Sequence, residues 1–404
     1  MGGNMNERKY TIKDYNYWKM ISGLAIASFF IFATMYSVQS ILPLFTKNYE
    51  ISISVASLSM SLSTVGLIFG LILIGFISDR YGRLLFIHLS ILITTIILFI
   101  IPFMESFIFI IILRFIQGFS LAGLLGSALG YMVEEIDKKY FGFAATLYIS
   151  SNSIGGMMGR FITGYLAESF SWQTAMFVLG AIGVFSYFLV LFTLPKSRYF
   201  QKSQVRFQED IAGFLYHLKN PSLLLMFGLG IVLQLSFTGM WTYLPFYLLE
   251  SPYELTLKQI SYLYFAYSLG VVGAPIAGWL TGKYKMRNIR IVGIIILTAG
   301  MLITLFHSFI LITIGLCVIC LGFFISHSLA TASVSQEATH HKGSASSLYL
   351  VAYYIGVSMG TTLLAPLWEK FGWNGIILVT GLLPLIYVMI IQVTRGKLKS
   401  KQAS

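Results

Sequence analysis

Apolar runs long enough to cross a bilayer alternate with short polar segments along the whole chain. Twelve such runs cover roughly residues 20–41, 54–77, 84–103, 107–131, 143–166, 173–194, 222–248, 259–280, 289–307, 309–334, 344–367 and 374–394. Each is close to the roughly 20 apolar residues that a membrane-spanning helix needs, and none shows the alternation of a membrane β-barrel strand. The pattern predicts an all-α integral membrane protein with 12 transmembrane helices.

Composition supports a lipid environment. Hydrophobic residues make up 57% of the 404 residues and charged residues 10%, whereas soluble domains carry about 25% charged residues. The first nineteen residues are polar and charged, and no small-residue cleavage site follows the first apolar run. We therefore expect the first run to remain in the protein as a helix.

The distribution of basic residues predicts an orientation. If both termini are cytoplasmic, 22 of the 27 Lys and Arg residues fall in cytoplasmic segments and 3 in outer loops. This asymmetry is the positive-inside signal of a multi-pass protein, here expected in the bacterial cytoplasmic (plasma) membrane. The net charge of +12 is then explained by insertion and by contact with anionic lipids, and no nucleic-acid partner is expected.

The second half of the chain repeats the first. Leu147–Trp172 aligns with Leu348–Trp373 at an offset of 201, and the glycine spacing of the second run recurs in the eighth. A parallel repeat implies a symmetry axis along the membrane normal and a substrate site between the halves near the midplane. We expect a monomer with five parts: a cytoplasmic tail (1–19), a six-helix bundle (20–194), a cytoplasmic linker (195–221), a second six-helix bundle (222–394) and a cytoplasmic tail (395–404).

The linker has the pattern of an amphipathic helix. Val205, Ile211, Leu215 and Leu218 share one side of Gln204–Lys219. Such a helix would lie on the inner membrane surface, and an unstructured linker is the alternative.

A charged motif follows the second apolar run. Its key residues are Gly75, Asp79, Arg80, Gly82 and Arg83. The motif resembles the G-x-x-x-D-R-x-G-R loop of the major facilitator superfamily, and it stands in the same loop, between the second and third spans. The resemblance implies two six-helix bundles and a conformational latch, which holds the outward-facing state and opens during the inward swing. Glu134 and Glu135 are the expected acidic partners of its arginines.

Further motifs are similar to those of the drug–proton antiporter branch of this family. Arg114, Gln117 and Gly118 resemble its R-x-x-Q-G motif, and Gly155–Arg160 occupies the place of its antiporter motif, with Gly156 where the proline stands and Arg160 where the second glycine stands. In overall look the chain is most similar to sugar- and metabolite-efflux (arabinose-efflux-like) exporters.

Two arginines are expected deep in the bilayer. Arg114 and Arg160 lie well inside apolar runs, while all fifteen acidic residues fall in tails, loops or helix ends. Because a charge at this depth is costly, it faces a partner or a water-filled cavity, and an anionic substrate group is one such partner. For Arg114 the alternative is hydrogen bonding to backbone carbonyls and to Gln117.

Polar residues on the predicted cavity-facing spans complete a candidate site. With the two arginines, the expected substrate-binding residues are Tyr36, Gln39, Gln117, Asn152, Gln234 and Trp241; Tyr264, Tyr267, Tyr353 and Tyr354 are weaker candidates. The candidates for proton coupling are Asp79, Glu134, Glu135 and His327. Histidine titrates near neutral pH, although a packing role for His327 is the alternative.

These features favour a secondary active transporter that uses protons to export a small anionic or zwitterionic metabolite, such as an opine-type metallophore, by alternating access. The alternatives are a multidrug efflux pump and an importer of a small organic anion. We expect a small-molecule substrate, protons and the lipid bilayer as partners, and no cofactor or metal. An enzyme is not expected, because the spans hold no nucleophile–base pair or metal-ligand set, and Cys317 and Cys320 fit packing on one helix face.

Overall fold

The computed structural model describes residues 8–204, 207–338 and 342–403. The N-terminal half contains α1 (Tyr15–Ser37), the 3₁₀ helix η1 (Val38–Ile41), α2 (Leu42–Asn48), α3 (Ile53–Tyr81), α4 (Arg83–Ile100), η2 (Ile101–Phe103), α5 (Phe107–Glu135), α6 (Lys138–Ser169) and α7 (Trp172–Thr193). The linker forms α8 (Phe207–Leu218). The C-terminal half contains α9 (Pro221–Leu249), α10 (Leu257–Leu263), η3 (Tyr264–Ala266), α11 (Tyr267–Leu280), α12 (Met286–Ile303), α13 (Phe309–Glu337), α14 (Lys342–Thr362) and α15 (Ala365–Ala403), which is kinked at Gly372.

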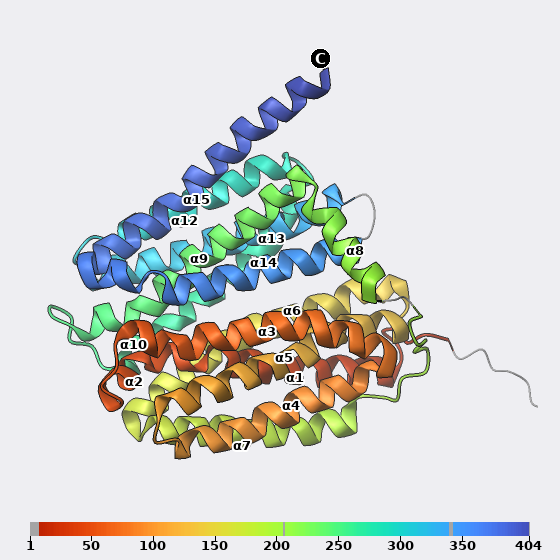
Figure 1. Cartoon of the computed structure of the whole chain (residues 1–404), viewed down its shortest axis with the longest axis horizontal. Coiled ribbons are helices and arrows are strands. Elements are labelled where there is room, and N and C mark those ends of the chain that lie inside the picture. Colours follow the sequence, from red (N-terminus) through yellow and green to blue (C-terminus); the bar gives the residue numbers. More distant parts are fainter. Residues whose placement is uncertain (1–7, 205–206, 339–341, 404) are drawn as a thin grey trace, which may run out of the picture.

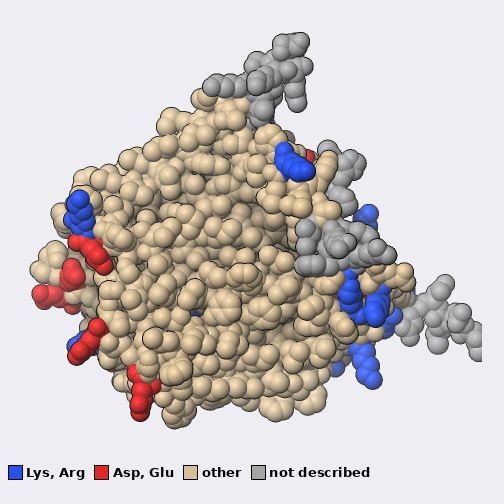
Figure 2. All heavy atoms as spheres, in the orientation of Figure 1, with Lys and Arg blue, Asp and Glu red and all other residues tan. Residues whose placement is uncertain are grey.

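The two halves lie one above the other in Figure 1, with their long helices side by side. Two ends of the molecule can be named from this view. The α8 end carries α8 and the turn between α3 and α4, and the α10 end carries α2 and α10. In Figure 2 most acidic residues of the visible face gather at the α10 end, most Lys and Arg residues gather at the α8 end, and an uncharged band separates them. Such a band is what the hydrocarbon core of a bilayer requires.

The structure confirms the predicted all-α membrane fold. In the described residues, ten helices are long and apolar enough to cross a membrane. The other two predicted runs, 143–166 and 344–367, are helical as well and correspond to α6 and α14. These two helices are less apolar because each packs against the opposite half, α6 against α10 and α14 against α3.

The first span differs from its prediction. The expected run 20–41 belongs to a longer segment, Tyr15–Asn48, in which α1 tightens into η1 before α2 begins with Pro43 in its first turn. Helical hydrogen bonding changes at this break, so nearby carbonyl groups become available to other donors.

Glycine contacts make the internal repeat visible in the packing. On α6, Gly155 and Gly159 lie against the α1 backbone, at Phe29 and Ala33, so that a Cβ on either glycine would collide with a carbonyl. The repeat-related Gly356 on α14 makes the same contact with the backbone of α9. Small residues allow this close approach of membrane helices.

The linker contains one helix, α8. Helix α8 covers most of the expected segment, with Leu215 and Leu218 exposed. Val205 lies outside the described residues, and the side chain of Ile211 is not described. The position of this helix on the membrane surface stays a prediction.

Side-chain contacts join the halves toward the α10 end. The Thr362 hydroxyl of α14 donates to the Ser61 hydroxyl of α3 at 2.8 Å. The Leu257 amide of α10 donates to the Glu168 carboxylate of α6 at 3.2 Å. A further connection, through Gln39, belongs to the candidate site.

Candidate functional site

Arg160 lies at the centre of a polar cluster between the halves. It is on α6 and 3% exposed. Its Nε donates to Gln39 Oε1 at 2.5 Å, and a second guanidinium nitrogen donates to the Gly156 carbonyl at 2.7 Å. The guanidinium carbon lies 4.1 Å from the centre of the Tyr36 ring, which is cation–π geometry. The Gly156 that stands in place of the antiporter-motif proline thus accepts a hydrogen bond from Arg160.

Gln39 connects this arginine to the other half. Its Nε2 donates to the Thr242 hydroxyl at 2.8 Å and to the Thr238 carbonyl at 3.2 Å, both on α9. Both threonines were missed at the sequence level, although their i, i+4 spacing on one face of the seventh span was a usable signal. The chain Arg160–Gln39–Thr242 is therefore a hydrogen-bonded bridge between the halves.

The C-terminal half contributes an aromatic wall beside Arg160. Trp241 comes from α9, Tyr264 from η3 and Tyr267 from the start of α11. The Trp241 ring lies 5.2 Å from Tyr264 and 5.0 Å from Tyr267, and Tyr267 lies 4.9 Å from the guanidinium carbon. The two tyrosines were weaker candidates at the sequence level, but the structure places both of them against Arg160.

The wall presents hydrogen-bond donors that lack acceptors. Trp241 Nε1, Tyr264 Oη and Tyr267 Oη are all buried without a hydrogen-bond partner. A buried polar group left unpaired costs about 1–3 kcal/mol. Three such donors beside a guanidinium make a region rich in donors and poor in acceptors, which suits a carboxylate or another oxyanion.

The other predicted amides lie on either side of this cluster. Gln234 Nε2 donates to the Thr238 hydroxyl at 2.8 Å, and its buried Oε1 has no partner. Asn152 lies on α6, toward the α8 end from Arg160, and accepts a hydrogen bond from Ser28 of α1. The structure thus places Gln39, Tyr36 and Trp241 around Arg160. Gln234 is linked to this cluster because it and Gln39 both donate hydrogen bonds to Thr238.

Arg114 has a different environment from the one expected of a substrate-binding residue. It is fully buried and donates to the carbonyls of Thr34, Met35 and Ser59 at 3.2, 2.9 and 3.0 Å and to Gln117 Oε1 at 2.5 Å. The first two carbonyls lie just before the tightening of α1 into η1. Arg114 therefore makes the hydrogen bonds that were the alternative for it, and they join α5 to α1 and α3. Gln117 Nε2 donates in turn to the Thr94 carbonyl of α4 at 3.2 Å.

The motif after α3 forms a charged cluster at the α8 end. Arg83 contacts Asp79 at 2.7 Å and Glu134 at 2.7 Å. Gly82 has a φ of 102°, a conformation that favours glycine. Arg80 donates to the Phe76 carbonyl at 2.8 Å and packs on the Phe76 ring. The predicted pairing of this motif with Glu134 is present, and it lies within the N-terminal half.

Glu135 pairs with the linker and not with the motif arginines. Its buried carboxylate accepts hydrogen bonds from the Arg198 amide at 2.5 Å, from Arg198 Nε at 3.0 Å and from the Tyr199 amide at 3.1 Å. Burial alone would lower the pKa of the Arg198 guanidinium. The hydrogen bond and the negative charge of Glu135 have the larger combined effect, so the pKa is raised. The Pro195–Tyr199 segment is thereby attached to α5.

His327 lies in an aromatic environment on α13. Its Nδ1 lies 3.0 Å from the Tyr349 hydroxyl, and its ring stacks on Phe323 at 5.5 Å. The Tyr353 ring lies 4.9 Å from the imidazole, and Phe323 stacks at 3.8 Å on Phe237, whose ring contacts Tyr267 beside Arg160. Tyr349 was missed at the sequence level, where nothing in the pattern distinguished it from other aromatic residues.

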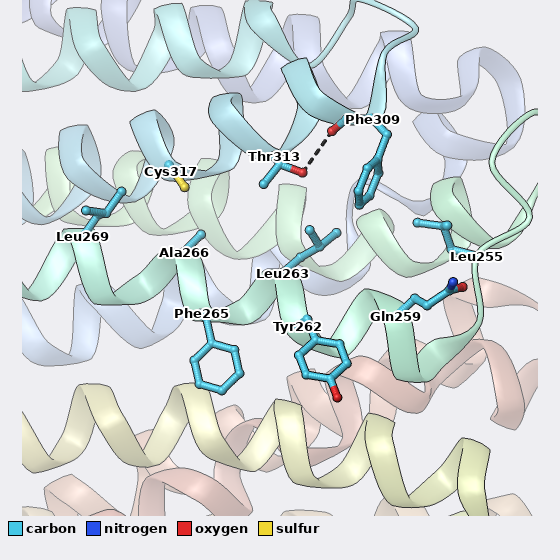
Figure 3. Close-up of a pocket in the computed structure, with 10 residues that line it drawn as sticks. All are labelled: Leu255, Gln259, Tyr262, Leu263, Phe265, Ala266, Leu269, Phe309, Thr313 and Cys317. Carbon is cyan, nitrogen blue, oxygen red and sulfur yellow. Dashed lines mark hydrogen bonds between the residues drawn. The ribbon is translucent and has the colours of Figure 1, made fainter.

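A separate pocket of about 660 Å³ opens between α10, η3 and α11 on one side and α13 on the other. Figure 3 shows Phe309, Thr313 and Cys317 contributed by α13. The Tyr262 and Phe265 rings extend in the other direction, toward α6. Its lining is largely apolar, and Cys317 is free, as is Cys320. In the described ranges, no group of three or more His, Cys, Asp or Glu residues is placed to hold a metal.

Comparisons with known proteins agree with this architecture. The family model described as Major Facilitator Superfamily matches residues 24–361. An uncharacterized transporter of Buchnera aphidicola subsp. Schizaphis graminum is 35% identical over 91% of this chain and 89% of its own, and the inner membrane transport protein YnfM of Escherichia coli is 33% identical over 89% and 86%. The crystal structure of the nucleoside transporter NupG superposes with a TM-score of 0.76 at 13% identity, over 93% of this chain and 99% of that one. The chain is therefore a multi-pass membrane transporter of the Major Facilitator Superfamily.

Proposed function

We propose that this transporter is a proton-coupled exporter of a small anionic or zwitterionic metabolite, and that Arg160 binds the anionic group. An opine-type metallophore is one cargo of this class. The observation that carries the proposal is the buried guanidinium with three unpaired donors beside it, on Trp241, Tyr264 and Tyr267.

A carboxylate would satisfy this cluster better than any other common metabolite group. Its two oxygens accept about four hydrogen bonds, enough for the three donors that lack partners and for the Arg160 guanidinium. Its charge would also compensate Arg160, for which the described residues provide a glutamine, a carbonyl and aromatic rings but no acidic partner. Because the donors come from both halves, the bound anion would connect the halves.

The arrangement suits alternating access. The contacts that join the halves lie toward the α10 end, and they include the Arg160–Gln39–Thr242 bridge. The charge asymmetry supports a cytoplasmic α8 end, with both termini on the cytoplasmic side of a bacterial cytoplasmic membrane. On this assignment the structure is closed toward the outside. In this state the proposed latch, Asp79–Arg83–Glu134, makes ion pairs within the N-terminal half.

Among the proton-coupling candidates, His327 is the one that adjoins the site. Asp79, Glu134 and Glu135 all have arginine partners at the α8 end. The His327 ring stacks on Phe323, and ring contacts continue through Phe237 to Tyr267, which lies beside Arg160. We propose that a proton on His327 acts on the binding of the substrate at Arg160, and that the acidic residues act in the conformational change.

The proposal is tested by comparing metabolites in the medium of a deletion strain complemented with wild-type, Arg160→Gln or Arg287→Gln protein. Arg287 is exposed, so its variant is a control for the loss of one positive charge. We expect an anionic or zwitterionic metabolite to accumulate outside only with wild type and Arg287→Gln, and its export to stop when a protonophore collapses the proton gradient.

Other outcomes of the same experiment identify the alternatives. Export of cationic dyes that survives Arg160→Gln would indicate a multidrug pump. Depletion of an organic anion from the medium by wild type would indicate an importer. Export that persists at wild-type levels without the proton gradient would contradict proton coupling but not the role of Arg160.

A further inference from the structure

The pocket of about 660 Å³ beside α13 opens on the lipid-facing side of the C-terminal half. Its walls belong to two segments that are apolar enough to cross a membrane, Leu257–Leu280 and Phe309–Glu337. Phe265, Leu269 and Phe309 line it and are exposed. In a membrane transporter, exposed apolar side chains of a spanning segment contact hydrocarbon. The molecules that can fill this pocket are therefore lipids.

The lining offers few polar groups to water. The Thr313 hydroxyl donates to the Phe309 carbonyl at 2.9 Å, as the dashed line in Figure 3 shows. The Cys317 thiol is a weak hydrogen-bonding group. Gln259 lies at the α10 end of the pocket, where its Oε1 accepts from the Thr256 amide at 2.9 Å. A buried water needs two to four polar partners, so the lining favours an apolar occupant.

The direction of the pocket suits an extended chain. The pocket follows α13 from Phe309 to Cys317. Eight residues of helix cover about 12 Å, which is most of the roughly 15 Å of hydrocarbon in one leaflet. Lys258 precedes Gln259 at the α10 end and provides a positive charge for the phosphate of a phospholipid. An acyl chain that enters from this end would lie along the pocket with its headgroup at the membrane surface.

The pocket exists because α10 follows the N-terminal half. Helix α11 packs against α13, whereas α10 packs against α6. The Tyr262 and Phe265 rings lie 5.5 and 5.0 Å from the Phe161 ring of α6. A Cβ at Gly164 of α6 would collide with the Ser261 hydroxyl of α10. In the proposed alternating access α10 leaves α6 when the halves separate, so the pocket belongs to the state in which they meet.

One turn of the chain separates this pocket from the candidate site. Leu263 and Ala266 line the pocket, while Tyr264 and Tyr267 lie beside Arg160. A chain in the pocket therefore supports the turn that carries two members of the aromatic wall.

We propose that this pocket binds one acyl chain of a membrane phospholipid, and that the bound chain favours the state in which α10 packs against α6. A ligand that binds one state more tightly shifts the equilibrium toward that state. The attraction comes from close packing, because the surrounding lipid chains are as apolar as the pocket. The proposal does not depend on the role of Arg160 in substrate binding.

Photo-crosslinking tests the site. Full-length protein is reconstituted in phosphatidylcholine vesicles that contain a small fraction of phosphatidylcholine with a diazirine on one acyl chain, and labelled peptides are identified by mass spectrometry. We expect stronger labelling of residues 309–317 than of the repeat-related residues 107–115 on α5, where Ile108 and Ile112 are exposed. Thr313→Trp should remove this excess by filling the pocket. Ile314→Trp, at an exposed position outside the lining, should retain it.

A matched pair on α6 tests the dependence on conformation. Gly164→Trp keeps α10 from packing against α6, so labelling of residues 309–317 should fall to the level of residues 107–115. Gly142→Trp should leave the labelling unchanged, because a Cβ at this position meets nothing within 4 Å. Gly164→Leu is the smaller substitution to use if the tryptophan variant does not fold.

Each outcome supports or overturns a defined part of the proposal. Equal labelling of residues 309–317 and 107–115 in wild type overturns the site, and so does excess labelling that Thr313→Trp retains. Equal excess labelling in the Gly164 and Gly142 variants overturns the preference for one state. Stronger labelling by a free diazirine fatty acid at the same membrane concentration would overturn the phospholipid as the occupant.

Discussion

Two buried arginines that look alike in the sequence have different roles in the structure. Arg114 is hydrogen-bonded to three backbone carbonyls and Gln117, within the N-terminal half. Arg160 has Gln39, one carbonyl and aromatic rings around it, at the boundary between the halves. We infer that the first arginine stabilises the fold and that the second is available to a ligand.

This difference predicts opposite effects of the same substitution. Arg114→Gln leaves buried carbonyls without donors, at about 1–3 kcal/mol each, so we expect a lower melting temperature of the purified protein. Arg160→Gln should abolish export with a much smaller thermal shift. Melting curves and transport assays on both variants separate the two effects. A stable Arg114→Gln protein that fails to transport would return Arg114 to the substrate site.

The sequence could identify these residues but could not assign their roles. Charge in an apolar run was sufficient to single out Arg114 and Arg160, and the spacing of a loop motif singled out the residues around Asp79. The role of Arg114 depends on carbonyls exposed where α1 tightens into η1, and apolar periodicity does not reveal such a break. The pairing of Glu135 with Arg198 was missed for a similar reason, because it depends on the path of an irregular linker segment.

At the scale of helices, one glycine can be distinguished from another only by its contacts. Glycines crowd several predicted spans, and the sequence treats them alike. In the structure, a Cβ at Gly159 would collide with the Ala33 carbonyl, whereas a Cβ at Gly142 on the same helix would meet nothing within 4 Å. Close packing of α1 against α6 therefore depends on the first position and not on the second.

The matched pair Gly159→Ala and Gly142→Ala tests this packing. We expect the first substitution to destabilise the protein by about 1–3 kcal/mol, since α1 and α6 must separate to admit the methyl group. The second should be neutral or slightly stabilising, because alanine is the better helix former. Thermal unfolding in one detergent measures both, and equal melting temperatures would contradict the assigned contact.

For the whole molecule, the proposed alternating access requires the halves to separate at the α10 end. The Ser61 and Thr362 hydroxyls, one from each half, lie 2.8 Å apart there. Cysteines at these positions are close enough for a disulfide. A control pair within the N-terminal half is Thr94 and Ser120, whose hydroxyls lie 3.4 Å apart on α4 and α5.

If separation at this end is part of the transport cycle, oxidising the Ser61→Cys, Thr362→Cys protein should abolish export, and a reductant should restore it. The Thr94→Cys, Ser120→Cys protein should export at the same rate in both states, because α4 and α5 move together within one half. Both variants are made with Cys317→Ser and Cys320→Ala so that the native thiols do not react. Undiminished export by the oxidised Ser61→Cys, Thr362→Cys protein would show that the cycle does not open the molecule here, and the bridge through Gln39 would then be a permanent contact between the halves.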